Sequence, residues 1–287
     1  MIVVTGATGQ LGSIVIEDLL ARGVPAGEIV AAVRTPEKAA RFAERGVQVR
    51  HADYNDPASL ATAFEGADKI LFISGTDVGQ REPQHRNVVE AARAAGVGLL
   101  AYTSILNADT AKLVLAGEHQ ATEAFIRESG VPFVFLRNGF YLDLYTSSFA
   151  QNLEHGAIVD ASGDARLSLA TRADFAGAAA AVLTGEGHEN KAYELGGDSA
   201  VTMTDLAAEL SRQSGRTVEY RDITASEYAA FLVSVGLPQP AADVYADSRV
   251  GMLRGELHTE TGDLSRLLGR PTTSLADAVA AGLKQLG

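Results

Sequence analysis

Apolar residues follow two alternating patterns through the first half of the chain, starting with the run MIVV at residues 1–4. Continuous apolar runs of about four to eight residues, bounded by turn signals, indicate strands buried on both faces. Apolar residues three or four positions apart, as at Leu11, Val15 and Leu19, indicate a helix with one buried face. The strands predicted in this way are 1–4, 28–33, 48–52, 69–74, 99–103 and 131–136, and the helices between them are 10–22, 36–45, 57–64, 83–95 and 118–129.

The regular alternation of strands and helices predicts a parallel sheet with helices on both faces, because parallel neighbours need a crossover connection. Strands in this number, joined by right-handed crossovers, make a Rossmann-type, doubly wound α/β fold. Beyond Arg137 the alternation ends. The later predicted strands are 192–195 and 218–221, and the later predicted helices are 172–183, 203–214, 225–235, 241–253 and 276–286.

This change of pattern predicts two units with an extended common interface. Residues 1–140 form the Rossmann domain, and 157–197 is expected to return to it. Residues 141–287 form a smaller, mainly helical C-terminal lobe on the substrate side, partly interleaved with the first unit. We expect this lobe to close over the ligand.

Composition limits the function further. The chain has 287 residues, of which 46% are hydrophobic and 21% charged, as in ordinary soluble globular proteins. Its net charge of −12 argues against nucleic acid as the partner, since no basic field is present to meet phosphates. It has no cysteine, which excludes disulfides and thiolate metal sites. No signal segment precedes the first strand and no apolar run approaches membrane length, so we expect a cytoplasmic protein without membrane insertion.

Three glycines, Gly6, Gly9 and Gly12, follow the first strand at the spacing G-x-x-G-x-x-G. Gly6 allows a tight turn, Gly9 lets backbone N–H groups approach a pyrophosphate, and Gly12 lets the next helix pack close to the sheet. The following helix directs the positive end of its dipole at the phosphate. Because the glycines follow a strand and open a helix, they predict a dinucleotide-binding turn rather than a ligand-free one.

The end of the second predicted strand indicates which dinucleotide is bound. NAD-binding Rossmann folds place an acidic residue there for the ribose hydroxyl, whereas this chain has Arg34. A guanidinium matches a 2′-phosphate, so NADP(H) is the predicted cofactor, the alternative being that Arg34 is only a solvated charge. Asp53 and Tyr54 follow the third strand and either flank the adenine or, for Asp53, cap the helix near Pro57.

The predicted helix 118–129 lacks the Tyr-x-x-x-Lys pair that many oxidoreductases of this fold use to protonate a carbonyl. His119 and Glu123 share one face of it, either as a proton relay or as a packed polar pair. Without a protein acid, hydride transfer suits an electrophilic acceptor such as a quinone, whose product anion is stable. Phe140, Tyr141 and Tyr145 either stack on a flat acceptor or pack as core aromatics.

The sequence resembles the NmrA-like branch of the atypical short-chain dehydrogenases, and most closely its bacterial NADPH-dependent, quinone-reducing members. The resemblance runs nearly end to end, and LRNGFY and VGQREPQHRNV are its most specific motifs. The stretches that carry it are 5–12 (TGATGQLG), 33–34, 52–54, 78–88 (VGQREPQHRNV), 101–104 (AYTS), 119–123, 136–141 (LRNGFY), 170–174 (ATRAD) and 193–199 (YELGGDS).

The resemblance implies NADPH as cofactor and direct hydride transfer to a quinone without flavin or metal. The residues that it assigns to the cofactor are Gly6, Ala7, Thr8, Gly9, Gln10, Leu11, Arg34, Ser74, Gly75, Asn138, Gly139, Phe140 and Tyr141. Candidates on the acceptor side are Asn138, Tyr141 and His119. This chain departs from quinone-reducing relatives after Gly139, where it has Phe140 instead of the tryptophan common in them.

Two other functions fit the same residues. A reductase of triphenylmethane-type dyes also transfers hydride to carbon without a protein acid. An NmrA-like redox sensor binds NADP(H) and a protein partner without turnover, and the missing Tyr-x-x-x-Lys pair is compatible with it. The resemblance extends across the second lobe, which favours the enzyme.

Overall fold

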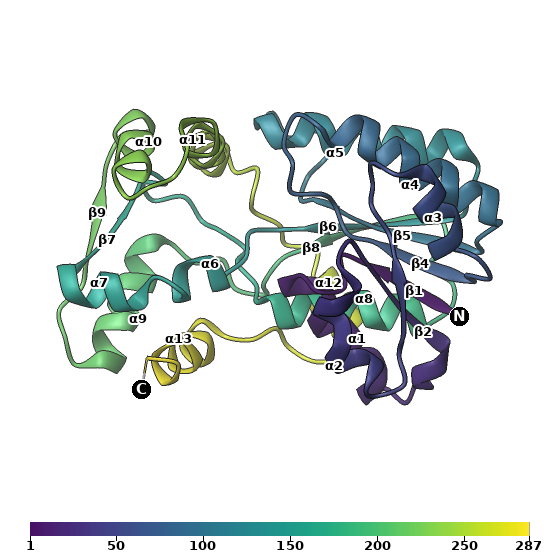
Figure 1. Ribbon diagram of the computed structural model, residues 1–287. Coiled ribbons are helices and arrows are strands. Elements are labelled where there is room, and N and C mark those ends of the chain that lie inside the picture. Colours follow the sequence, from purple (N-terminus) through teal and green to yellow (C-terminus); the bar gives the residue numbers. More distant parts are fainter. Residues whose placement is uncertain (287) are drawn as a thin grey trace.

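A seven-stranded parallel sheet forms the centre of the protein in the computed structural model, which describes residues 1–286 (Figure 1). Its strand order is β3-β2-β1-β4-β5-β6-β8, and all neighbours are parallel. The order reverses between β1 and β4, which is where doubly wound sheets bind ligands. The strands are β1 (Ile2–Thr5), β2 (Ile29–Val33), β3 (Gln48–His51), β4 (Lys69–Phe72), β5 (Leu99–Ile105), β6 (Phe133–Asn138) and β8 (Lys191–Leu195).

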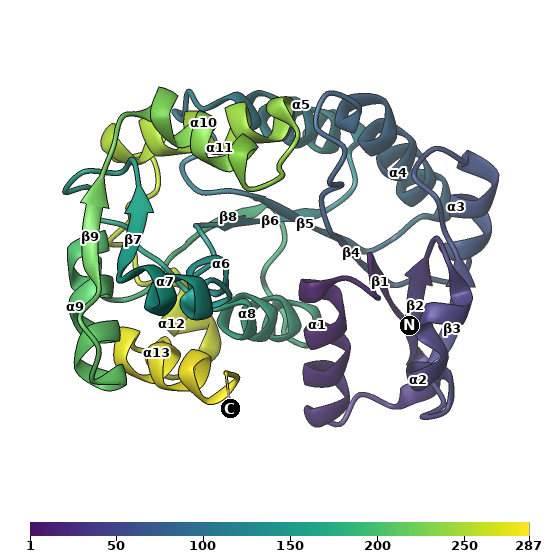
Figure 2. The same cartoon turned by 60° about the vertical axis from the view of Figure 1, so that its left-hand side comes forward.

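Helices cover both faces of this sheet (Figures 1 and 2). The face bearing Val4, Ala31 and Leu71 is buried under α1 (Gln10–Ala21), α8 (Arg172–Thr184) and α12 (Asp263–Leu268). The opposite face, with Phe72 and Tyr102, is buried under α3 (Pro57–Ala63), α4 (Arg81–Ala95) and α5 (Val114–Ser129). The crossover after β2 contains η2 (Pro36–Ala39) and α2 (Ala40–Ala43), and η1 (Ala26–Glu28) precedes β2.

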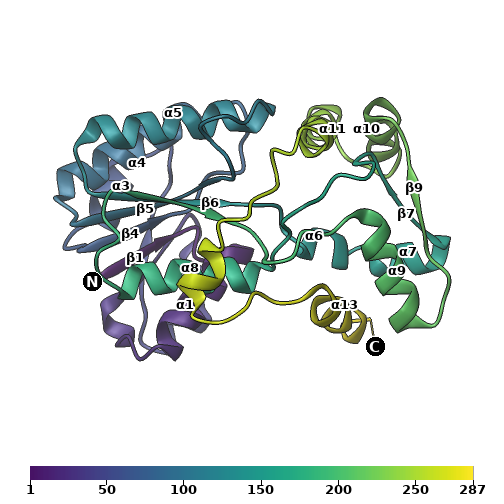
Figure 3. The same ribbon diagram turned by 180° about the vertical axis from the view of Figure 1, so that it is seen from behind.

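A smaller lobe lies beyond the carboxyl ends of the strands, as seen from behind in Figure 3. Its strands β7 (Ala157–Asp160) and β9 (Glu219–Asp222) form a two-stranded parallel sheet. Its own apolar core contains Phe149, Met203 and Leu257. Its helices are α6 (Asp143–Thr146), α7 (Phe149–His155), α9 (Met203–Ser214), α10 (Ala225–Ser234), α11 (Gln239–Leu253) and α13 (Leu275–Lys284). Within residues 1–286, no helix has the length and apolar character needed to span a membrane.

The predicted Rossmann-type fold is confirmed. Within 157–197, the segment expected to return to the Rossmann domain, α8 and β8 join its layers, whereas β7 pairs with β9 in the lobe. Local patterns did not indicate α6, α7, β7 or α12, because each is short and depends on packing more than on its own sequence. Helix α5 also begins at Val114, four residues before its predicted start.

Candidate functional site

The glycine turn between β1 and α1 has the geometry of a phosphate cradle. Gly6 has φ +57°, and its carbonyl accepts a 2.9 Å hydrogen bond from the Gly9 N–H. A Cβ on Gly12 would lie 2.5 Å from the Gly6 oxygen, so a side chain cannot be accommodated there without moving the turn. No side chain caps α1 at Gly9, and Thr8 and Gln10 are exposed. The first N–H groups of α1 are therefore open to an anionic ligand, as a dinucleotide requires.

Arg34 lies exposed directly after β2, at the same edge of the sheet as the glycine turn. Tyr54 is close enough for the Arg34 charge to act on its hydroxyl, although burial dominates and raises the pKa of Tyr54 above its ordinary value. The Tyr54 hydroxyl donates to the Ile73 carbonyl at 2.7 Å. The suggestion that Asp53 caps the next helix is wrong. Asp56, directly before Pro57 at the first helical position, accepts the Ala58 N–H at 3.0 Å, and only a residue next to the first turn can do so.

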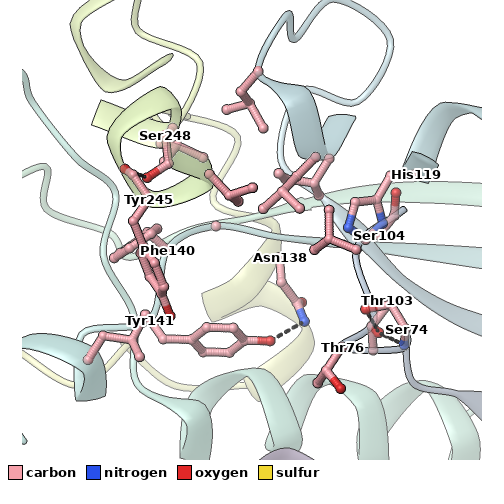
Figure 4. A pocket seen from close by; sticks show the side chains of 18 of the residues that line it. Ser74, Thr76, Thr103, Ser104, His119, Asn138, Phe140, Tyr141, Tyr245 and Ser248 are labelled. Atoms are coloured by element: carbon pink, nitrogen blue, oxygen red, sulfur yellow. Dashed lines mark hydrogen bonds between the residues drawn. The ribbon is translucent and has the colours of Figure 1, made fainter. Parts of the chain in front are cut away.

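A cavity of about 720 Å³ opens at the carboxyl ends of β4, β5 and β6 and is bordered on its far side by α11 (Figure 4). Its polar wall includes Ser74, Ser104 and Asn138. Two arginines line it, Arg81 and Arg172, and no carboxylate from residues 1–286 does so. The other lining residues are Thr76, Val78, Thr103, Ile105, Leu113, Leu115, His119, Gly139, Phe140, Tyr141, Leu144, Pro240, Ala241, Val244, Tyr245, Ser248 and Leu257. The cavity is thus largely apolar, and each of its two cations is paired at 3.7 Å with a carboxylate outside the lining, Arg81 with Glu118 and Arg172 with Asp143.

The loop after β4 is held in place by buried side chains. The Ser74 N–H donates to Thr103 Oγ1 at 2.9 Å, and the Gly75 N–H donates to His85 Nε2 at 3.0 Å. Because Nε2 accepts, the proton lies on Nδ1, which donates to Thr122 Oγ1 at 2.8 Å. Burial lowers the pKa of His85 to about 3, so the imidazole is neutral at physiological pH.

Residues 138–141 form the floor of the cavity. Asn138 ends β6, its Nδ2 donates to the Tyr141 hydroxyl at 3.4 Å, and its Oδ1 is buried without a hydrogen-bond partner. The Tyr141 ring packs edge-on against Phe175 and lies beneath the Arg172 guanidinium, 5.1 Å from the ring centroid. Phe140 and Tyr141 therefore border the cavity, as an acceptor-stacking role requires. Tyr145 does not line it and packs against Phe140 in the lobe core.

His119 and Glu123 share a helix face, but their side chains bind different partners. His119 lines the cavity, and its ring lies 2.7 Å from the Tyr102 hydroxyl and 3.4 Å from Arg81 Nη1. Glu123 accepts hydrogen bonds from Ser104 and from Arg137 instead. No hydrogen bond joins His119 to Glu123 within the described chain, so the structure does not connect them as a relay. Burial lowers the pKa of His119 to about 3, so its imidazole is neutral at neutral pH, and it raises the pKa of Tyr102 above its usual range, so that hydroxyl keeps its proton.

Several cavity residues carry no sequence signal of their own that marks them as candidates. Arg81 lay within the motif VGQREPQHRNV, and that motif was the available signal for it. Tyr245 and Ser248 come from α11, where no local pattern marks a ligand site. Helix α11 is anchored by Arg249, which donates to Asp160 at 2.9 Å and to the Tyr228 hydroxyl at 2.8 Å.

The known proteins that this chain resembles, in sequence and in structure, include oxidoreductases of one family. The model of the NmrA-like family matches residues 1–250. Quinone oxidoreductase 2 of Escherichia coli is 53% identical, over 98% of this chain and 98% of its own length. The crystal structure of an NADPH-dependent quinone oxidoreductase from E. coli complexed with NADPH has a TM-score of 0.95 and covers 98% of this chain and 99% of its own. A triphenylmethane reductase from Citrobacter sp., complexed with NADP(H), is 44% identical with a TM-score of 0.94, over 98% of this chain and 100% of its own.

Proposed function

This chain belongs to the NmrA-like family, and from that premise we propose that it is an NADPH-dependent oxidoreductase that transfers hydride directly to a quinone, without flavin or metal. The observation that carries the proposal is the apolar, cation-bearing cavity at the carboxyl ends of β4, β5 and β6. The relative at 53% identity, named a quinone oxidoreductase, supports the choice of acceptor.

The cofactor would be held along the carboxyl edge of the sheet. The backbone of residues 6–11 would receive the pyrophosphate, because α1 leaves its first N–H groups open there. Arg34 would bind the 2′-phosphate, and Ser74, Gly75 and residues 138–141 would border the nicotinamide half. When bound, NADPH supplies the hydride.

The chain's own residues would act by orientation and exclusion of water. Phe140 and Tyr141 border the cavity and would hold a flat acceptor, while α11 covers its far side. Since His119 is neutral and Tyr102 is buried behind it, the cavity has no imidazolium to supply a proton at neutral pH. The product anion would then take its proton from water, which a quinone tolerates and a simple ketone does not.

The direct test measures NADPH consumption with benzoquinone, a triphenylmethane dye and a simple ketone as separate acceptors. We expect turnover with the quinone, slower turnover when NADH replaces NADPH, and none with the ketone. Binding of NADPH without turnover of quinone or dye would contradict the proposal and favour a redox sensor. Turnover of the dye alone would favour a dye reductase, and activity on ketones would oppose the argument from the missing acid.

Replacing Arg34 by glutamate should remove the preference for NADPH, because a carboxylate repels the 2′-phosphate where the guanidinium attracts it. We expect the dissociation constant of NADPH to rise about 100-fold and that of NADH to change little, as measured by fluorescence titration. Arg93→Glu is the matched control, since Arg93 is exposed in the last turn of α4, at the opposite edge of the sheet. An unchanged NADPH-to-NADH ratio in Arg34→Glu would refute this role for Arg34.

A further inference from the structure

Arg81 is a buried cation on the cavity wall whose role the proposed function leaves open. It is the first residue of α4 and is 8% exposed. Its Nη1 lies 3.4 Å from His119 Nε2, and its Nε lies 3.7 Å from Glu118 Oε2. Both that Nε and that Oε2 are buried without a hydrogen-bond partner. The guanidinium is therefore held in position by His119 and Glu118 at a place where Arg81 lines the cavity.

The groups around Arg81 are one counter-ion, Glu118, and two neutral histidines. Glu118 lies on α5, its Oε1 accepts the Gly79 N–H at 2.8 Å, and it does not line the cavity. His119 and His85 stay neutral, because burial and the nearby Arg81 charge lower the pKa of each to about 3. Arg81 accordingly presents a cation to an otherwise mostly apolar space.

The second arginine in the cavity, Arg172, lies on a different wall. Arg172 begins α8, which packs against α1 on the face of the sheet that holds the glycine turn. Its guanidinium lies over the Tyr141 ring and 3.7 Å from Asp143. It thus lies beside Tyr141, with Asp143 as its counter-ion, whereas Arg81 comes from α4 on the opposite face of the sheet.

We propose that Arg81 is a catalytic residue that binds the oxyanion formed on the acceptor, and that it selects acceptors that become anionic over acceptors that are cationic. This inference rests on the proposed function, from which it takes the reaction, hydride transfer to a quinone. In that reaction the quinone gains a hydrogen nucleus and two electrons as the donor C–H bond breaks, and NADPH is oxidised to NADP⁺. One quinone oxygen is left negative until water protonates it. A fixed donor in an apolar site stabilises such charge far more than it would in water.

The same geometry predicts discrimination against cationic dyes. A triphenylmethane dye carries a positive charge before hydride transfer and none afterwards. Arg81 would oppose its binding and would offer nothing to its product. A quinone starts neutral and ends negative, so its transition state gains from the same guanidinium.

The test compares Arg81→Gln with the wild type on benzoquinone and on a triphenylmethane dye. We expect kcat for the quinone to fall about 100-fold, while kcat/KM for the dye stays equal or rises. Arg86→Gln is the matched control, since Arg86 lies exposed on the same helix and stacks on Phe125 outside the cavity. Equal losses for both acceptors, or an undiminished quinone rate, would overturn the proposal.

Two further measurements separate this role from a structural one. Glu118→Gln keeps an oxygen for the Gly79 N–H but removes the charge beside Arg81, so quinone turnover should be retained or raised and dye turnover lowered. A hydroxynaphthoquinone whose ring hydroxyl is ionised at neutral pH serves as an anionic probe. Its dissociation constant from the NADP⁺-loaded protein should rise about tenfold in Arg81→Gln. The dissociation constant of the naphthoquinone without the hydroxyl should not change. If the wild type turns over no quinone, the proposed function fails while this binding comparison still decides the role of Arg81. Equal binding of the ionised compound by both proteins would refute it.

Discussion

Replacing Gly12 by alanine is expected to raise the dissociation constant of NADPH by about 100-fold or more, since a displaced turn no longer presents its N–H groups to the phosphate. The new Cβ would lie 2.5 Å from the Gly6 oxygen and 3.0 Å from the Ala7 Cα. Both are backbone atoms, so the contact is relieved only by shifting the turn or α1. We also expect the free energy of unfolding to fall by about 1–3 kcal/mol.

Fluorescence titration with NADPH and thermal unfolding without it measure these two effects. Gly117→Ala is the matched control, because Gly117 lies within α5 and no atom beyond its own stretch of helix backbone lies within 4 Å of its would-be Cβ. That substitution should stabilise the protein by about 0.5–1 kcal/mol, since alanine favours helix more than glycine does. NADPH affinity retained in Gly12→Ala would refute the tight-turn account of the phosphate site.

Replacing Arg137 by leucine is expected to lower the free energy of unfolding by about 3–5 kcal/mol. The Arg137 guanidinium contacts three carboxylates, Glu123 at 2.7 Å, Asp109 at 2.7 Å and Glu194 at 2.8 Å. The Glu123 side chain is only 2% exposed, so removal of the cation leaves a buried charge without its main partner. The cluster joins α5, β6 and β8 directly before Asn138, so its loss should also weaken binding in the cavity.

Urea unfolding of the two proteins across pH checks this result. Hydrogen bonds from Arg137 lower the pKa of Asp109, so the stabilisation is present above the unfolded-state pKa of about 4 and is lost as pH falls through the folded value. The difference in the free energy of unfolding between the wild type and Arg137→Leu should therefore become smaller at acidic pH. Arg127→Gln is the control, since Arg127 also contacts Glu123, at 3.2 Å, but is half-exposed. Its cost should be about 1 kcal/mol or less; a cost equal to that of Arg137→Leu would contradict the argument from burial.

The strands and helices of the Rossmann domain were predictable because their signals are local. Apolar runs and the glycine spacing involve residues close together in the chain, so they indicate the same local structure however the other segments are arranged. The position of Asp56 as the helix cap also depends on a neighbour, Pro57, so the alternative that Asp53 caps this helix is wrong. Strand β7 was missed because its partner β9 lies about sixty residues later in the sequence.

The cavity chemistry was not predictable in the same way. The sequence places His119 and Glu123 on one helix face, but whether they meet each other depends on what α4, β5 and β6 present to that face. Tyr102 and Arg81 contact His119, and Arg137 donates a hydrogen bond to Glu123. Tyr145 likewise turns into the lobe core, although it follows Phe140 and Tyr141 closely in the chain.

The sequence by itself determined the fold class, the glycine turn and the absence of an acid in the Tyr-x-x-x-Lys position. Each of these depends on residue types at fixed spacing within one or two elements. The tertiary structure alone decided that Arg81 faces the cavity, that His119 stays neutral and that α11 borders the acceptor space. These features arise where segments far apart in the chain meet, and burial there sets the charge of each group through desolvation, which spacing does not encode.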